Sequence, residues 1–272
     1  KNSKLHHGVN YVEIPAELSG VDARILALVG SNFPTGSHKV GATFGCLVPK
    51  LVTGQFLPTK EKAVWPSTGN YCRGGVYNAK LFSSESIAVM PKSVSKERFT
   101  WLNNMEAEIV TTSGNGNNVK KILDKSKKIK NEEDNIYIFN QFKEFGNHLW
   151  HYEVTGSAME ELLEDIMGKD DRYVGMAISS GSSGSLGSGD YMKELYPASK
   201  VVVGEALQCS TLLNNGFGSH RIEGISDSFI PWIHNVKNTD MVVAIDDNDT
   251  INLLRLFNTK IGRDYLASQG FS

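Results

Sequence analysis

The sequence has little cysteine, no long apolar run and almost no net charge. Among its 272 residues only Cys46, Cys72 and Cys209 are cysteines, widely separated and odd in number. They fit neither a disulfide framework nor a zinc-binding spacing, so we expect a reducing, cytoplasmic setting. No apolar stretch is long enough to span a bilayer, and no signal peptide is visible. The net charge of −2 gives no reason to expect a nucleic acid or a membrane as partner.

Two other features do not indicate a site. His148 and His151 are close in the sequence, but no nearby acid or cysteine completes a set of ligands, so we expect no metal. The basic run at 120–130 is followed by "NEED". Mixed charge of this kind is typical of the solvated face of a helix.

The sequence does contain a regular alternation of short apolar runs and helical patterns. Short β-branched strands separated by helices indicate parallel sheets that are covered on both faces, so the predicted class is α/β. In such folds ligands bind at the carboxyl ends of strands, on the loops that lead into helices. The apolar runs lie at 23–29, 62–65, 86–90, 107–111, 135–139, 173–178, 200–205 and 241–245.

A lysine stands at the predicted start of a helix, in "PTGSHKVGA" (34–42). A cation is unfavourable there, because the N-terminus of a helix already carries the positive end of its dipole. Such a position, combined with partial burial, disfavours the ammonium form and frees a nucleophilic amine. Lys39 is therefore either an ordinary surface residue or a residue whose amine acts as a nucleophile.

A loop rich in glycine and serine, "SSGSSGSLGSG" (179–189), follows a predicted strand and leads into a helix. Its uncovered backbone N–H groups would form a cradle for a phosphate, and serine hydroxyls would add donors. The glycine spacing differs from the G-x-G-x-x-G pattern of dinucleotide-binding folds, so we keep that interpretation only as an alternative. The residues expected to hold a phosphate are Gly181, Ser182, Ser183, Gly184 and Ser185.

A second loop, "PSTGNY" (66–71), also joins a strand to a helix. The hydroxyls of Ser67 and Thr68, together with backbone N–H groups exposed at Gly69, are suited to a carboxylate. Asn70 can both donate and accept, which suits a phenolic oxygen beside an imine. Alone, the loop is equally well explained as an N-capped helix start.

One kind of chemistry requires a nucleophilic lysine, a loop that binds a phosphate and a loop that binds a carboxylate. They are typical of an enzyme that acts on amino acids with pyridoxal phosphate, whose aldehyde forms a Schiff base with lysine. The sequence resembles the β-family, or fold type II, of these enzymes, which includes cysteine synthase, threonine synthase and tryptophan synthase β. The resemblance rests on four motifs in order between 23 and 257, namely "FPTGSHKVGA", "PSTGNY", "SGSSGS" and "HRIEGI".

The resemblance implies roles for particular residues. Lys39 would be the catalytic lysine, Asn70 would contact the ring hydroxyl, and His38 would help to hold the phosphate or merely pack. Gln141, in "NQF", and Gly224, in "HRIEGI", would border the substrate. The family's fold implies a smaller mobile domain at 40–150, with the carboxylate loop, and a larger domain made of 1–39 and 151–272, with the phosphate loop. Family members are commonly dimers, so we expect a homodimer.

Two features depart from the family. A further helix and strand would normally follow, carrying the residue that pairs with the pyridine nitrogen, but the sequence stops at Ser272 and begins with Lys1. The chain is therefore a fragment, is completed by another part, or has lost part of the site. The other departure is Arg73. Its side chain would either bind an acidic group of the substrate or form an ion pair on the surface.

The implied activity is replacement of the β-substituent of a serine- or cysteine-type amino acid. A β-eliminating lyase or deaminase acting on a small amino acid is the first alternative. A non-catalytic subunit that lacks the C-terminal part of the site is another. The resemblance does not separate them, because a few pocket side chains decide the leaving group and the nucleophile.

Overall fold

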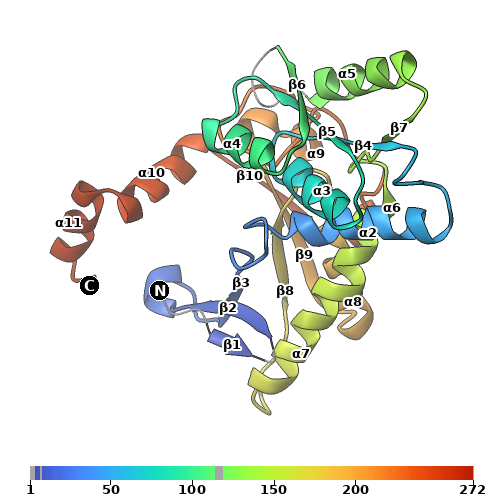
Figure 1. The fold of residues 1–272 in the computed structure, drawn as a ribbon. Coiled ribbons are helices and arrows are strands. Elements are labelled where there is room, and N and C mark those ends of the chain that lie inside the picture. Colours follow the sequence, from blue (N-terminus) through green and yellow to red (C-terminus); the bar gives the residue numbers. More distant parts are fainter. Residues whose placement is uncertain (1–3, 7, 114–118, 272) are drawn as a thin grey trace.

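A computed structural model describes residues 4–6, 8–113 and 119–271 (Figure 1). Within them the strands form a four-stranded parallel sheet, a three-stranded parallel sheet and a three-stranded antiparallel sheet. The predicted α/β class with mainly parallel sheets is confirmed. None of the helices in the described residues is long and apolar enough to cross a membrane.

The four-stranded sheet has helices on both faces. Its strands alternate, so that Ala63 and Trp65 face one side while Val64 faces the other. Helices α2, α3 and α4 cover the first side, and α5 covers the second. The strands in spatial order are β6 (Glu108–Thr112), β5 (Ser86–Pro91), β4 (Lys62–Pro66) and β7 (Ile136–Ile138), and the helices are α2 (Lys39–Val52), α3 (Asn70–Leu81), α4 (Lys96–Asn104) and α5 (Val119–Glu132).

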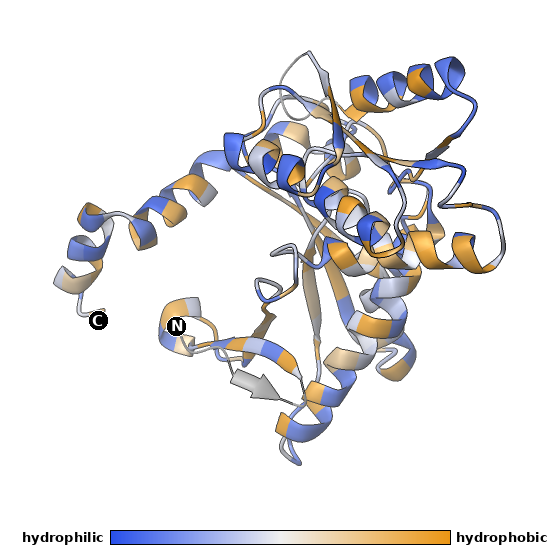
Figure 2. Cartoon of the chain, in the orientation of Figure 1, coloured by the Kyte–Doolittle hydropathy of each residue, from blue (hydrophilic) through white to orange (hydrophobic). Residues whose placement is uncertain are grey.

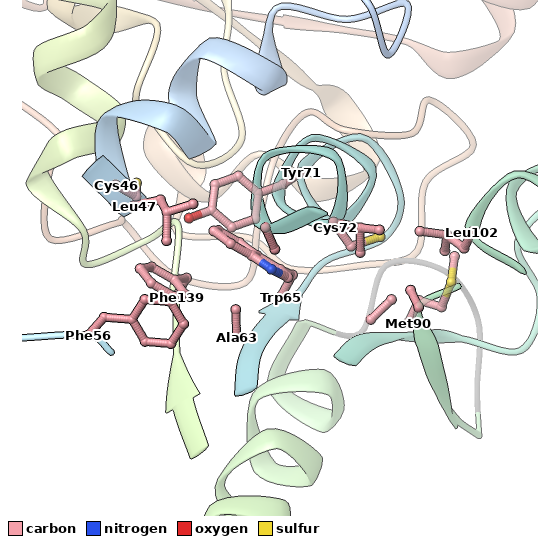
Figure 3. Packing of buried hydrophobic residues seen from close by; sticks show 14 of the residues in the cluster. Cys46, Leu47, Phe56, Ala63, Trp65, Tyr71, Cys72, Met90, Leu102 and Phe139 are labelled. Carbon is pink, nitrogen blue, oxygen red and sulfur yellow. The ribbon is translucent and has the colours of Figure 1, made fainter. Parts of the chain in front are cut away.

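Aromatic residues fill the side of this sheet that faces α2 and α3. The rings of Trp65 and Phe139 stack with centroids 4.4 Å apart, and Tyr71 meets Trp65 edge-on at 5.6 Å. Figure 3 shows Phe56 and Leu47 in the same cluster, below and beside these rings. Large buried aromatic surfaces contribute much of the stability of such a core. The cluster therefore fixes α2 and α3, which carry two of the predicted site segments.

The three-stranded parallel sheet has β9 (Lys200–Ala206) between β10 (Met241–Ile245) and β8 (Gly175–Ser179). The apolar side chains of Ile178 and Val203 pack against Leu186 at the start of α8 (Leu186–Leu195). The N-terminus of this helix therefore lies at the carboxyl end of β8.

The residue pattern at 152–167 predicts a helix, and in the structure this helical stretch begins earlier. The structure has α6 (Phe145–Trp150), a π-helical turn η1 (His151–Gly156) and α7 (Ser157–Ile166) in direct succession. The buried side chains of Asn147, His148 and His151 lie in the first two of these segments. Polar residues of this kind weaken the amphipathic pattern, which explains why the sequence pattern located only the later part.

The run at 23–29 forms a strand, but this strand does not join the parallel sheets. Strand β3 (Ile25–Leu28) pairs antiparallel with β2 (Val9–Ile14), which pairs with β1 (Lys4–His6). The short connection between β2 and β3 contains only the helix α1 (Ala16–Ser19), too little for a parallel crossover.

Near the C-terminus, helices α10 (Asp247–Asn258) and α11 (Lys260–Ser268) extend away from the sheets (Figure 1). Figure 2 shows apolar and polar residues alternating along both helices. On the edge strand β10, Met241, Val243 and Ile245 are exposed. The remaining short elements are α9 (Thr211–Asn214) and the 3₁₀ turns η2 (Leu207–Cys209) and η3 (Val236–Asn238).

The core beneath α2 can be tested by truncation. Leu47 is completely buried, so Leu47→Ala removes apolar contacts and leaves a cavity, and we expect it to lower the free energy of unfolding by about 2–5 kcal/mol. Val52, in the same helix, is 81% exposed, and Val52→Ala should change this free energy by about 0.5 kcal/mol or less. Urea denaturation followed by circular dichroism measures both. Equal effects of the two substitutions would contradict the position of α2.

Candidate active site

Helix α2 begins at Lys39 and crosses its neighbours at very short distances. A Cβ added to Gly41 would lie 1.9 Å from the Trp150 ring, and one added to Gly45 would lie 2.9 Å from the Cβ of Trp150. On the α3 side, a Cβ on Gly74 would lie 2.7 Å from the Lys39 carbonyl oxygen. Only glycine permits these approaches without displacement. They fix the first turn of α2 between α3 and α6.

The amine of Lys39 reaches the glycine- and serine-rich loop of the other parallel sheet. Its Nζ donates to Ser182 Oγ at 2.9 Å, and the same oxygen accepts a hydrogen bond from Asn147 Nδ2 at 3.1 Å. Burial lowers the pKa of Lys39 from 10.5 to about 8. The neutral amine, which is the nucleophilic and basic form, is therefore well populated at mildly alkaline pH.

The loop at 181–185 presents backbone N–H groups at the N-terminus of α8. No oxygen within the described ranges accepts a hydrogen bond from these five groups. Uncommitted N–H groups at a helix start are suited to an anion such as phosphate. Among the side chains, Ser182 contacts Lys39, whereas Ser183 Oγ lies 3.1 Å from His234 Nδ1.

The predicted carboxylate loop follows β4. Ser67 is buried, and its Oγ accepts a hydrogen bond from the Gly69 N–H at 3.1 Å. The Thr68 carbonyl accepts from Arg98 Nη1 at 3.0 Å. Asn70 is exposed and starts α3. The loop is thus held by its own hydrogen bonds and by a guanidinium from α4.

These loops meet at one cavity of about 170 Å³. The cavity brings together most of the residues that the sequence pointed to. Four others, Gly69, Ser183, Gly184 and Ser185, do not line it. Those that line it are His38, Lys39, Ser67, Thr68, Asn70, Gln141, Gly181, Ser182 and Gly224.

His38 lies in the cavity wall next to a second histidine. Its ring meets that of His151 edge-on, with centroids 4.8 Å apart. Burial, and to a smaller extent the charge of Lys39, lowers the pKa of His38 to about 4. At neutral pH the imidazole is uncharged, so it can offer a phosphate a hydrogen bond but no positive charge.

Three charged cavity residues were missed by the sequence analysis. Arg98 comes from α4, and its Nη1 pairs with Glu223 Oε2 at 2.5 Å. Burial raises the pKa of Asp227 to about 6, although hydrogen bonds from Ser228 oppose the shift. No sequence signal marks Arg98, which lies in an ordinary polar helix start. Glu223 lies inside the motif "HRIEGI" (220–225), of which only Gly224 was given a role, and Asp227 lies two residues beyond it.

Arg73 does not line the cavity. Its guanidinium carbon lies 4.8 Å from the centre of the Trp101 ring, which is a cation–π contact. Arg73 thus packs against α4, which is neither of the two roles that the sequence suggested for it.

Together the fold and the cavity define a class of α/β protein in which a desolvated lysine amine lies beside an anion-binding loop at the ends of parallel strands. The chain belongs to the family of pyridoxal-phosphate dependent enzymes, whose model matches residues 8–264. The residues present fit this cofactor. The uncommitted N–H groups of 181–185 suit its phosphate, and the Lys39 amine, 2.9 Å from Ser182 in that loop, suits its aldehyde.

Similar proteins include cysteine synthases, cystathionine beta-synthases and hydrogen sulfide-producing enzymes. A probable cysteine synthase of Bacillus subtilis is 30% identical over 82% of this chain and 70% of the relative. Cystathionine beta-synthase of Apis mellifera is 29% identical over 70% of this chain, which spans only 38% of that protein. A solved structure of a hydrogen sulfide-producing enzyme from Fusobacterium nucleatum is 27% identical, with a TM-score of 0.76 over 84% of this chain and 68% of that one. Another such enzyme from the same organism, 23% identical, shares the fold with a TM-score of 0.81 over 93% of this chain and 83% of that one.

The raised pKa of Asp227 predicts a pH dependence of stability. Because its pKa in the folded protein, about 6, exceeds the ordinary 3.8, the folded state holds a proton between these values that the unfolded chain has lost. The contribution of Asp227 to the free energy of unfolding is therefore complete below about pH 4 and is lost as the pH rises through 6. We expect this loss to be on the order of 2–4 kcal/mol relative to Asp227→Asn.

Urea unfolding at several pH values between 4 and 7.5 measures this difference. Ser228→Ala is a matched variant, because it removes a hydrogen bond that opposes the shift, so the midpoint should move to higher pH. Parallel pH profiles of the wild-type protein and Asp227→Asn would rule out the assigned environment.

Proposed function

We propose that this chain replaces the β-substituent of a serine- or cysteine-type amino acid, using pyridoxal phosphate bound in the cavity. The observation that carries the proposal is the position of Lys39 Nζ, 2.9 Å from Ser182 Oγ in the anion-binding loop. The loop at 67–70 lines the same cavity. A lysine amine, a phosphate site and a carboxylate site within one small volume are what this chemistry requires.

Bound pyridoxal phosphate supplies an aldehyde that condenses with amines and a ring that withdraws electrons from the α-carbon. The backbone N–H groups of 181–185 would hold its phosphate. Asn70 would contact the ring hydroxyl, and His38 would add an uncharged hydrogen-bonding group at the same end of α2. These assignments use only residues of the cavity wall and of the adjoining loop.

The amino-acid substrate would be oriented by the loop that follows β4. Ser67, Thr68 and the backbone beside Gly69 would bind its α-carboxylate, which leaves the α-proton facing Lys39. The pKa of about 8 allows the Lys39 amine to accept this proton near physiological pH and to return it later. Gln141 and Gly224, which also line the cavity, would border the β-substituent.

The alternative outcome is β-elimination to pyruvate and ammonia. It is favoured by the likeness to a hydrogen sulfide-producing enzyme at 27% identity, whereas the likeness to a probable cysteine synthase at 30% identity favours replacement. Both outcomes use the same proton transfer by Lys39. They differ in whether a thiol or water reacts after the β-substituent has left.

We further propose that residues 40–150 form the smaller, mobile unit, and that 1–39 with 151–272 forms the larger one. The separate parallel sheets, one within each unit, support this division. A homodimer stays a prediction from the family resemblance. A cytoplasmic location stays a prediction from the three cysteines, which are free and buried in the structure.

The role of Lys39 can be tested directly. Borohydride reduction of the protein loaded with pyridoxal phosphate should fix the cofactor on the peptide that contains Lys39, as identified by mass spectrometry. Lys39→Ala should abolish the yellow colour and reduce turnover of β-substituted amino acids about 10²–10⁴-fold, because it removes the group that moves the proton.

Lys50→Ala is the matched control, since Lys50 belongs to the same helix but pairs with Glu144 outside the cavity. It should keep both colour and activity. A Lys39→Ala variant that differs from the wild type only in stability would favour a non-catalytic subunit.

The balance between replacement and elimination is a separate measurement. With O-acetyl-L-serine and excess sulfide, we expect cysteine to exceed pyruvate among the products, because a strong nucleophile outcompetes water in a small cavity. Chromatography of the amino acids and an assay for pyruvate give the ratio. Pyruvate as the main product at saturating sulfide would instead support the eliminating activity.

A further inference from the structure

The cavity holds a permanent positive charge that the proposed reaction does not use. Arg98 contributes a guanidinium to the lining that also contains Lys39 and His38. In the proposed function, the N–H groups of 181–185 bind the phosphate and the loop at 67–70 binds the α-carboxylate. The proposed reaction therefore gives the guanidinium no role, and its anionic partner in the structure is Glu223.

The surroundings of Arg98 hold its guanidinium in a fixed position. Nη1 donates to the Thr68 carbonyl at 3.0 Å, which anchors it to the carboxylate loop. A Cβ on Gly69 would lie 2.8 Å from the guanidinium carbon, so the absence of a side chain at 69 makes room for it. The Arg98 side chain is only 19% exposed. These contacts hold the positively charged Arg98 side chain in one position.

The partner of Arg98 is far less constrained. Glu223 reaches Arg98 with Oε2 at 2.5 Å, but its side chain is 48% exposed and it belongs to an irregular segment between α9 and η3. An ion pair with one solvated partner contributes little, because water screens it and the side chain loses freedom. Of the two residues, Glu223 is the one that can leave at low cost.

We propose that Arg98 binds a carboxylate on the thiol nucleophile, in exchange for Glu223. This inference rests on the proposed function and specifies its substrate class as thiols that carry an anionic group. A guanidinium can donate two parallel hydrogen bonds to a carboxylate, whereas Glu223 engages it through one oxygen. The exchange leaves Arg98 paired and releases Glu223 to water.

The kinetic test uses two thiols of similar length that differ in charge, 3-mercaptopropionate and 2-mercaptoethanol, with O-acetyl-L-serine as donor. In each reaction a C–S bond replaces the Cβ–O bond, and acetate and the thiol proton are released. Arg98→Gln should lower the ratio of kcat/KM for the anionic thiol to kcat/KM for the neutral thiol at least tenfold, on top of any loss that both thiols share because the loop at 67–70 is held less firmly. Arg98→Lys should restore part of the lost kcat/KM for the anionic thiol. It keeps the positive charge but lacks the two parallel N–H donors of a guanidinium.

Glu223→Gln gives an effect of opposite sign. It removes the competing carboxylate, so kcat/KM for 3-mercaptopropionate should rise several-fold, with no change for 2-mercaptoethanol. A role of Arg98 in positioning the 67–70 loop alone would instead raise KM for the donor and slow both thiols equally. That pattern would overturn the proposal.

A binding measurement keeps this inference separate from the reaction. Calorimetry on the cofactor-loaded protein with saturating L-alanine, which has no β-leaving group, compares 3-(methylthio)propionate with neutral 3-(methylthio)propanol. We expect the anion to bind at least tenfold more tightly, and Arg98→Gln to abolish the difference. Absence of turnover with every thiol would contradict the proposed function alone, whereas equal anion preference in the wild type and Arg98→Gln would refute the role of Arg98.

Discussion

The contact between the Lys39 amine and the Ser182 hydroxyl joins the two parallel sheets, and the cavity depends on it. The two residues are far apart in the sequence, Lys39 at the start of α2 and Ser182 after β8, yet Nζ and Oγ are 2.9 Å apart. The contact is possible because glycines in α2 and α3 let the surrounding helices approach to distances that a methyl group would block. Close packing thus serves to place one amine beside one loop, and it limits how far the first turn of α2 can move.

Burial has a common electrostatic effect on the titratable groups of the cavity. It lowers the pKa of Lys39 to about 8 and that of His38 to about 4, and it raises the pKa of Asp227 to about 6. In each case the uncharged form gains, since desolvation disfavours charge of either sign. An anionic ligand in this cavity would rely on backbone N–H groups and a helix N-terminus. Arg98 differs because a carboxylate, that of Glu223, pairs with its guanidinium.

The loops around the cavity differ in what holds them. The loop at 67–70 is tied by its own hydrogen bonds and by Arg98, and the loop at 181–185 is tied through Ser182 and Ser183 while its N–H groups stay uncommitted. A site needs both properties, because fixed side chains define the geometry and unsatisfied donors provide the affinity. Glu223 lies on a segment without regular secondary structure and its side chain is half exposed, which is suited to the side where substrates differ.

The sequence by itself determined the α/β class, the strands and the loops that matter, because short apolar runs and turn residues are local signals. It also singled out Lys39, Ser67 and Ser182, since motifs of small and hydroxyl-bearing residues stand next to those strands. Only the tertiary structure decided that β3 pairs antiparallel and that Arg98 joins the cavity. It likewise turned Ser183 toward His234. These outcomes depend on which distant segments meet, and no local pattern records the burial or the partner that a side chain acquires when they do.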